Sequence, residues 1–155
     1  MGVYDSCAIY GSGQNMYCWG CNRHNGICKG SDPLGDIDDY NNSSESFLTV
    51  SVGINHACGL VHGTQEVLCW GDSALSSYST AVSAVEVGGY ANHYVVITQD
   101  GSLDARGVDD FGELEAPSGP FISVSSNEEH SCGIRPNHTL QCWGDDTHNE
   151  IYPPE

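Results

Sequence analysis

Short segments in which apolar and polar residues alternate run along most of the chain, separated by turn-forming residues. The clearest set lies near the C-terminal end, where residues 121–125, 130–134 and 139–143 each alternate like a half-buried strand. Polar and Pro-containing turns at 126–129 and 135–138 separate them. The pattern predicts a small antiparallel sheet of three strands, and no segment of the chain gives a convincing helical pattern.

The same order of strands is predicted twice upstream. The predicted strands are residues 47–52, 55–60 and 66–70 in one set, and 84–87, 93–97 and 102–105 in the other. In each set a first strand, which we call the leading strand, precedes a hairpin of two strands. A further hairpin is predicted at residues 7–19, and nothing before it resembles a leading strand.

A cysteine pattern recurs in register with these strands. A Cys is followed ten or eleven positions later by Cys-Trp-Gly, in the pairs Cys7/Cys18, Cys58/Cys69 and Cys132/Cys142. A worn copy has Val95 and Ala105 at the same two positions. The first positions, 7, 58, 95 and 132, are 51, 37 and 37 residues apart. A fixed period of this kind indicates stacked supersecondary units.

The predicted fold is therefore all-β, built from propeller-type repeats of about 37 residues. We expect one repeat domain over residues 1–155. Its repeats are approximately 3–46 with an insertion at 21–46, then 47–83, 84–120 and 121–155. Four hairpins with only three leading strands should not close a ring unaided, so we expect upstream sequence or a neighbouring copy to complete the ends.

The eight cysteines predict disulfides formed in an oxidising compartment, because their number is even and most of them recur with the repeat. We expect the pairs Cys7–Cys18, Cys58–Cys69 and Cys132–Cys142 within hairpins, and Cys21–Cys28 within the insertion. The alternative for the insertion is a zinc knuckle, because Cys18, Cys21, His24 and Cys28 have suitable spacing. We favour disulfides because the repeat already pairs Cys18 with Cys7.

A formal net charge of −17, with four Lys and Arg residues in total, excludes nucleic acid as a plausible partner. Cations, basic proteins and neutral glycans stay open as partners, as does a role in solubility alone. No apolar run approaches the length of a membrane span, so we expect no membrane insertion. The opening residues do not resemble a signal peptide.

Two features of the polar segments are candidate sites. Hard oxygen ligands cluster in the insertion, at Asp32, Asp36, Asp38 and Asp39, where a calcium site and a solvated acidic loop are both open readings. Sequons predict glycosylation at Asn41, Asn42 and Asn137. No cofactor is predicted apart from this calcium ion.

The recurring histidines and tryptophans are interpreted as structural. His56, His93 and His130 share one repeat position, where each is expected to bond to a neighbouring strand's backbone. The tryptophans, which directly follow a Cys of the pattern, are expected in the core between units: Trp19, Trp70 and Trp143. No nucleophile elbow, phosphate-binding loop or metalloprotease motif occurs, so we predict that the chain is not an enzyme.

Residues 56–72 and 130–145 resemble the regulator of chromosome condensation repeat through His-Ala-Cys-Gly-Leu or His-Ser-Cys-Gly-Ile followed by Cys-Trp-Gly-Asp. Residues 117–124 resemble that repeat's first strand. The Cys-containing form is similar to extracellular relatives such as crinkly-type plant receptor ectodomains. The resemblance implies a β-propeller that serves as a binding scaffold, and the family's chromatin role is opposed here by the acidity and the cysteines.

Together these observations predict a secreted or cell-surface protein that acts as a non-catalytic binding or structural assembly module. Its expected partner is another protein or copies of itself, with a glycan as a further option. The alternative is an enzyme inhibitor or a glycan-binding protein that uses acidic loops on the rim of the array.

Overall fold

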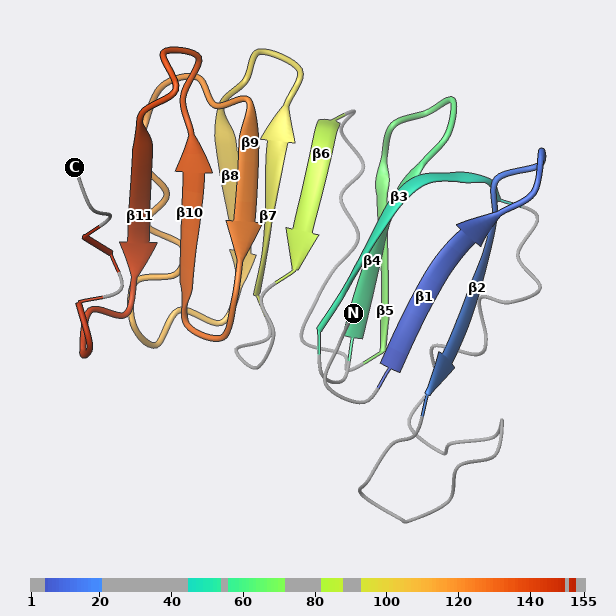
Figure 1. Cartoon of the computed structure of the whole chain (residues 1–155), viewed down its shortest axis with the longest axis horizontal. Coiled ribbons are helices and arrows are strands. Elements are labelled where there is room, and N and C mark those ends of the chain that lie inside the picture. Colours follow the sequence, from blue (N-terminus) through green and yellow to red (C-terminus); the bar gives the residue numbers. More distant parts are fainter. Residues whose placement is uncertain are drawn as a thin grey trace.

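A computed structural model describes residues 5–20, 45–53, 56–71, 82–87, 93–149 and 151–152 of the 155-residue chain. Within these residues the structure is all-β, with eleven strands and no helix, and therefore no helix of the length and apolarity that a membrane span requires. The strands form four separate antiparallel sheets, shown in Figure 1. The predicted fold class is confirmed.

The first sheet has two strands among the described residues, and the other three sheets have three each. In each three-stranded sheet the chain runs through neighbouring strands in order, so the second strand is central. The strands are β1 (Asp5–Tyr10) and β2 (Asn15–Gly20), then β3 (Phe47–Val52), β4 (His56–Val61) and β5 (Val67–Gly71), then β6 (Val82–Val87), β7 (His93–Thr98) and β8 (Leu103–Gly107), then β9 (Ser123–Ser126), β10 (His130–Ile134) and β11 (Leu140–Gly144).

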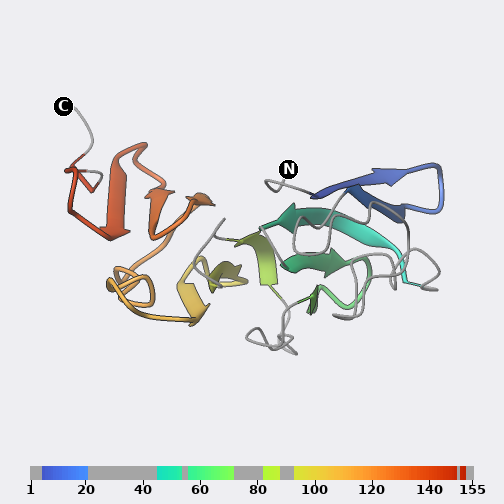
Figure 2. The same cartoon turned by 90° about the horizontal axis from the view of Figure 1, so that it is seen from below.

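The sheets follow one another along an open arc, with the first and fourth sheets at its two ends (Figure 2). The leading strands β3, β6 and β9 lie next to one another, since β3 contacts β6 and β6 contacts β9. Strand β1 contacts β3 directly. This is the arrangement expected of propeller-type repeats, in which each unit is one small sheet stacked on the next.

A backbone hydrogen bond joins each sheet to the next at the hairpin turn. Phe47 N–H donates to the Gln14 carbonyl at 3.0 Å, and Val82 N–H donates to the Gln65 carbonyl at 2.8 Å. Phe121 N–H donates to the Gly101 carbonyl at 2.8 Å. All three acceptor residues have a positive φ, so the turn adopts the same left-handed conformation each time.

The core lies between successive sheets. One apolar cluster joins the first and second sheets through residues such as Met16, Cys18 and Trp70. A second cluster joins the second and third sheets around Leu60 and Tyr94, and a third cluster, with Ile97 and Trp143, joins the third and fourth. The second and third sheets thus each bury one face against the preceding sheet and the other against the following sheet, because neighbouring residues of a strand point to opposite faces.

An aromatic residue at the start of the leading strand packs over a glycine of the central strand. Phe47 lies over Gly59, where an added Cβ atom would come within 2.5 Å of the ring. The ring centroids of Phe47 and Trp70 are 6.1 Å apart in a tilted arrangement. Phe121, Gly133 and Trp143 repeat this arrangement in the fourth sheet, with ring centroids 6.4 Å apart.

Candidate functional site

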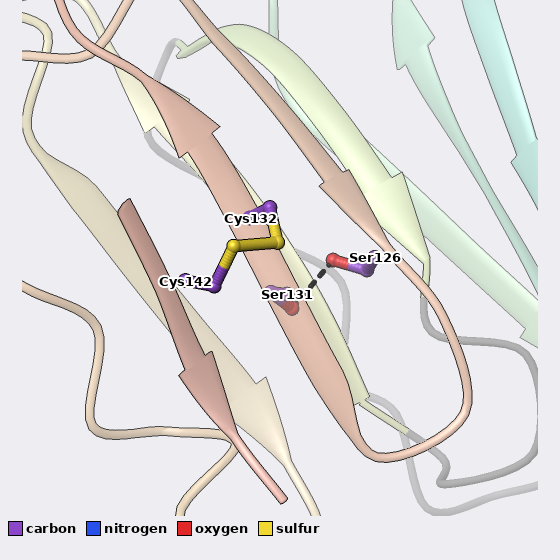
Figure 3. Close-up of a disulfide and its surroundings, with 4 residues drawn as sticks. All are labelled: Ser126, Ser131, Cys132 and Cys142. Carbon is purple, nitrogen blue, oxygen red and sulfur yellow. Dashed lines mark hydrogen bonds between the residues drawn. A yellow bond between two sulfur atoms is a disulfide. The ribbon is translucent and has the colours of Figure 1, made fainter. Parts of the chain in front are cut away.

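Disulfides cross-link three of the four hairpins. The pairs are Cys7–Cys18, Cys58–Cys69 and Cys132–Cys142, with Cα–Cα distances of 4.0, 4.1 and 4.0 Å. Both residues of each pair stand directly opposite one another on antiparallel strands. Figure 3 shows the bridge between β10 and β11. These are the three hairpin pairs that the repeat predicts.

The third hairpin has the same register without a bridge. Val95 pairs with Ala105 across β7 and β8, as the cysteines do in the other hairpins. Val95 is fully buried, and it packs in the cluster between the third and fourth sheets. The predicted alignment of this worn repeat is therefore correct, since a misalignment by one residue would place the two side chains on opposite faces.

The predicted sites of the insertion lie outside the described residues. They are the cysteines Cys21 and Cys28, the acidic residues Asp32, Asp36, Asp38 and Asp39, and the sequons at Asn41 and Asn42. The third sequon is described: Asn137 lies in the exposed turn between β10 and β11. Its side-chain oxygen accepts hydrogen bonds from the N–H (3.2 Å) and hydroxyl (2.7 Å) of Thr139, and glycosylation there stays a prediction.

The repeated histidine position lies between sheets. His56 and His93 are fully buried, and His93 Nε2 is 3.3 Å from the hydroxyl of Ser131 on the fourth sheet. Ser131 in turn lies 2.8 Å from Ser126, as Figure 3 shows. This contact of His93 is to a side-chain hydroxyl, and the predicted bond from this position to a neighbouring strand's backbone stays a prediction. Ser131 and His93 have no exposed surface, so this Ser–His pair offers no access to a substrate.

The two tryptophans with described side chains lie in the cores between sheets, as predicted. Trp70 and Trp143 are 9% and 5% exposed. Trp143 also donates from Nε1 to the carbonyl of Glu113 at 2.9 Å. This bond joins β11 to the loop between β8 and β9. It could not be predicted from the sequence, because Glu113 is one acidic residue in an acidic loop.

Acidic side chains gather around the end of the fourth sheet where β9 turns into β10. Glu129 lies in this acidic rim, and partial burial together with the nearby carboxylates raises its pKa. The side-chain hydrogen bond from Thr147 lowers the pKa of Asp145. The carboxylates that act on Glu129 are those of Asp145, Glu113, Glu128 and Asp110. In the described part of the chain no group of side chains has the geometry to hold a metal ion.

Glu113 differs from the other residues of the acidic rim because it is fully buried. Its Oε2 accepts a hydrogen bond from the N–H of Phe111 at 2.8 Å. The neighbouring Asp109 carboxylate accepts a hydrogen bond from the N–H of Leu114 at 3.1 Å. These bonds fold the loop back on itself and hold its backbone against Trp143, so the acidic rim is built on a fixed loop.

A match to a known family covers the fourth unit. Residues 121–150 match the regulator of chromosome condensation (RCC1) repeat. The fourth unit is thus similar to this repeat in sequence. The predicted resemblance to this type of repeat propeller is confirmed. No curated protein matches the whole chain closely in sequence.

Solved structures extend the likeness in fold to the other three sheets. The CRINKLY WD40 ectodomain of the Arabidopsis thaliana receptor kinase ACR4 aligns with 100% of this chain and 51% of its own, at a TM-score of 0.76 and 21% identity. The ectodomain of the Physcomitrella patens receptor kinase CR4 aligns with 92% of this chain and 39% of its own, at a TM-score of 0.75 and 22% identity.

Prp20p from Saccharomyces cerevisiae, whose structure was described with its binding to Gsp1p and histones, is similar as well. It aligns with 98% of this chain and 44% of its own, at a TM-score of 0.74 and 20% identity. The chain therefore spans about half the length, or less, of the propeller structures that it resembles. These likenesses establish the propeller-type fold.

Proposed function

We propose that the chain is an extracellular, non-catalytic module that binds protein through the acidic surface of a disulfide-braced propeller array. The observation that carries the proposal is the set of three disulfides, each of which spans a hairpin at the same repeat position. Bridges of this kind persist in oxidising compartments and are rare in the cytosol. The similarity to two receptor ectodomains supports the same location.

Charge points to the kind of partner. With a formal net charge of −17, the surface attracts cationic proteins and repels phosphate-rich molecules. The acidic rim adds to this charge: partial burial and, after it, the neighbouring carboxylates raise the pKa of Glu129. A basic protein docking there would relieve the mutual repulsion of these carboxylates.

A binding role without catalysis agrees with the arrangement of reactive groups. The hydroxyl of Ser131 and the imidazole of His93, which lie 3.3 Å apart, are enclosed between two sheets. Catalysis by such a pair requires a pocket in which a substrate reaches the hydroxyl. Both side chains instead join the third and fourth sheets.

Binding to immobilised basic proteins tests the proposal. We expect the oxidised chain to bind a basic protein and to lose affinity as salt rises, while an acidic protein of similar size should not bind. The chain with Glu128→Gln, Glu129→Gln and Asp145→Asn should bind more weakly. A control with the same charge change on other sheets, Glu66→Gln, Asp100→Asn and Asp104→Asn, should bind like the unaltered chain.

Two results would contradict the proposal. Equal loss of affinity in the two triple variants would mean that net charge alone drives the binding. Free thiols at the six bridged positions, found by alkylation of protein from its natural source, would place the chain in a reducing compartment.

A further inference from the structure

A glutamine side chain bridges the second and third sheets at their hairpin turns. The side-chain amide of Gln99, in the turn between β7 and β8, donates to the side-chain oxygen of Gln65 at 3.2 Å. It also donates to the carbonyl of Val82, the first residue of β6, at 3.0 Å. One carboxamide therefore satisfies the carbonyl at the start of a leading strand and reaches the preceding sheet.

The junction between the third and fourth sheets has the same backbone register with different residues. The N–H of Phe121 donates to the Gly101 carbonyl at 2.8 Å. The same bond joins Val82 to Gln65 one sheet earlier, so the two pairs are equivalent. Gly101 has no side chain, and an added Cβ atom there would lie 3.5 Å from the Phe121 carbonyl oxygen. That oxygen thus faces the space that the glycine leaves open.

Pro136 stands at the position of Gln99. A backbone hydrogen bond closes the hairpin at the residue before each of them, Thr98 and Arg135. A proline side chain has no amide to donate. Within the described residues no hydrogen-bond donor reaches the Phe121 carbonyl. The donor that Gln99 supplies at one junction is therefore missing at the next.

A groove lies where this donor is missing. It has a volume of about 420 Å³, which is within the range of ligand pockets. Its walls are the turn at 97–101, the segment 120–122 and Pro136, and we call it the turn groove. Ile122 is 56% exposed there, so the turn groove combines an apolar wall with the Phe121 carbonyl.

Hydrogen bonds and a ring contact hold the walls of the turn groove in place. Ile122 N–H donates to the Ile134 carbonyl at 2.8 Å. Arg135 donates to the Ser118 carbonyl at 2.9 Å, and its guanidinium carbon lies 4.4 Å from the centroid of the Phe121 ring. A groove that is formed before binding costs a ligand little ordering of the protein.

We propose that the turn groove binds a glutamine side chain of a partner protein. Its amide donates to the Phe121 carbonyl, as the Gln99 amide donates to the equivalent carbonyl, and its methylene groups pack against Ile122 and Pro136. The proposal rests on the proposed function only in taking the partner to be a protein. It uses a different surface, because the acidic rim and the turn after β10 lie at opposite ends of the fourth sheet (Figure 1).

Salt dependence separates the two contacts. A carboxamide is neutral, so its binding does not change as salt screens the charge of the chain. Binding of a basic protein at the acidic rim weakens under the same change. Either proposal can therefore fail alone.

The first experiment titrates the nitrogen-15-labelled chain with N-acetylglutamine methylamide and follows the backbone amide signals by NMR. We expect saturable shifts centred on Gly101, Phe121 and Ile122, with a dissociation constant on the order of 1–10 mM that is independent of salt. The matched probe replaces the side-chain amide by a methyl ester, which is also neutral but has no N–H to donate. It should give no saturable shift at these residues.

The second experiment fills the turn groove from within. Pro136→Gln supplies the chain's own amide, as Gln99 does at the preceding junction, and should weaken binding of the glutamine probe by about tenfold or more. Pro117→Gln is the matched control, because Pro117 does not line the turn groove, and it should bind like the unaltered chain. Both variants should keep the salt-dependent binding of a basic protein.

Three results would overturn the inference. They are the absence of saturable shifts at the groove residues, equal shifts with the amide and ester probes, and equal binding by the two glutamine variants. N-acetyllysine methylamide gives a further comparison, since tighter binding of this probe at the same residues would mean that the groove selects a cation. The amide spectrum of each variant shows whether it is folded.

Discussion

The third sheet differs from the second and fourth sheets at the cysteine, phenylalanine, glycine and tryptophan positions of the repeat, while it keeps the histidine position at His93. The second sheet has a disulfide between Cys58 and Cys69, and Val95 and Ala105 stand at these two positions in the third. The second and fourth sheets also have a Phe over a Gly and beside a Trp. In the third sheet these positions hold Val82, Val96 and Arg106.

From this comparison we expect the replacements to be coupled. The Phe–Gly pair and the Val–Val pair fill the same apolar space, and they divide its volume differently between the two residues. Val82 and Val96 are fully buried. Arg106 takes the Trp position with its side chain exposed and paired with Asp104 at 3.3 Å. The strand register is unchanged, so the third sheet keeps the repeat backbone through burial on both of its faces.

Removing a bridge should have the largest effect. Cys58→Ala with Cys69→Ala turns the second sheet toward the third, and we expect it to lower the free energy of unfolding by about 3 kcal/mol, because the unfolded chain gains the freedom of an open loop. Urea unfolding of the oxidised variant and the unaltered chain measures the loss. An unchanged midpoint would show that burial alone holds the second sheet, as it holds the third.

The Phe–Gly pair gives the next effect. Gly59→Val should destabilise the chain by about 1–3 kcal/mol, because its side chain enters the space of the Phe47 ring. Adding Phe47→Val recreates the pair of the third sheet and should restore part of the loss. A double-mutant cycle by urea unfolding measures the coupling. Strictly additive effects would contradict the coupled replacement.

A bridge introduced into the third sheet should have a smaller, stabilising effect. Val95→Cys with Ala105→Cys places two cysteines directly opposite one another, as in the three natural pairs. We expect a disulfide by mass spectrometry and a gain of up to about 2 kcal/mol, because engineered bridges often give less than the loop model predicts. The single variants Val95→Cys and Ala105→Cys, which cannot form this bridge, are the controls under the same oxidising conditions. Persistent free thiols would mean that the third hairpin differs in geometry.

The smallest effect should come from the acidic rim of the fourth sheet. Since the pKa of Glu129 is raised on folding, its charged form is less favourable in the folded chain, and this cost is present above the raised pKa and absent below the unfolded value. Glu129→Gln should therefore raise the melting temperature slightly at neutral pH and not in acid. Glu66→Gln, outside the rim, is the control; equal shifts in both would point to a general charge effect.

Sequence patterns were sufficient to predict the repeat units of the fold, because each unit depends on contacts between residues that are close in sequence. The Cys-Trp-Gly period placed all four hairpins, and alternation placed β3 at 47–52, as observed. The leading strand expected at 84–87 begins at Val82, and the strand expected at 121–125 begins at Ser123. Strand β6 begins earlier, at the residue whose N–H donates to the Gln65 carbonyl of the preceding sheet, whereas the corresponding bond of Phe121 lies two residues before β9; both bonds join residues distant in sequence.

Individual side-chain contacts could not be predicted from the sequence. The packing of Phe121 over Gly133 and the bond from Trp143 to Glu113 each join residues whose individual types carry no sign of the partner. The histidine position was identified as structural, but its acceptor on the next sheet, Ser131, depends on how two sheets are set against each other.

The link between sheets at the hairpin turn has a consequence for how such chains change in evolution. The hydrogen bond uses only backbone atoms, and the residues that provide the carbonyl are Gln14, Gln65 and Gly101, with His138 at the fourth position. Because the junction requires no particular side chain, a gene segment for one unit can be duplicated or deleted without a second compensating substitution there. The number of units is thus free to drift between lineages while the unit itself stays fixed.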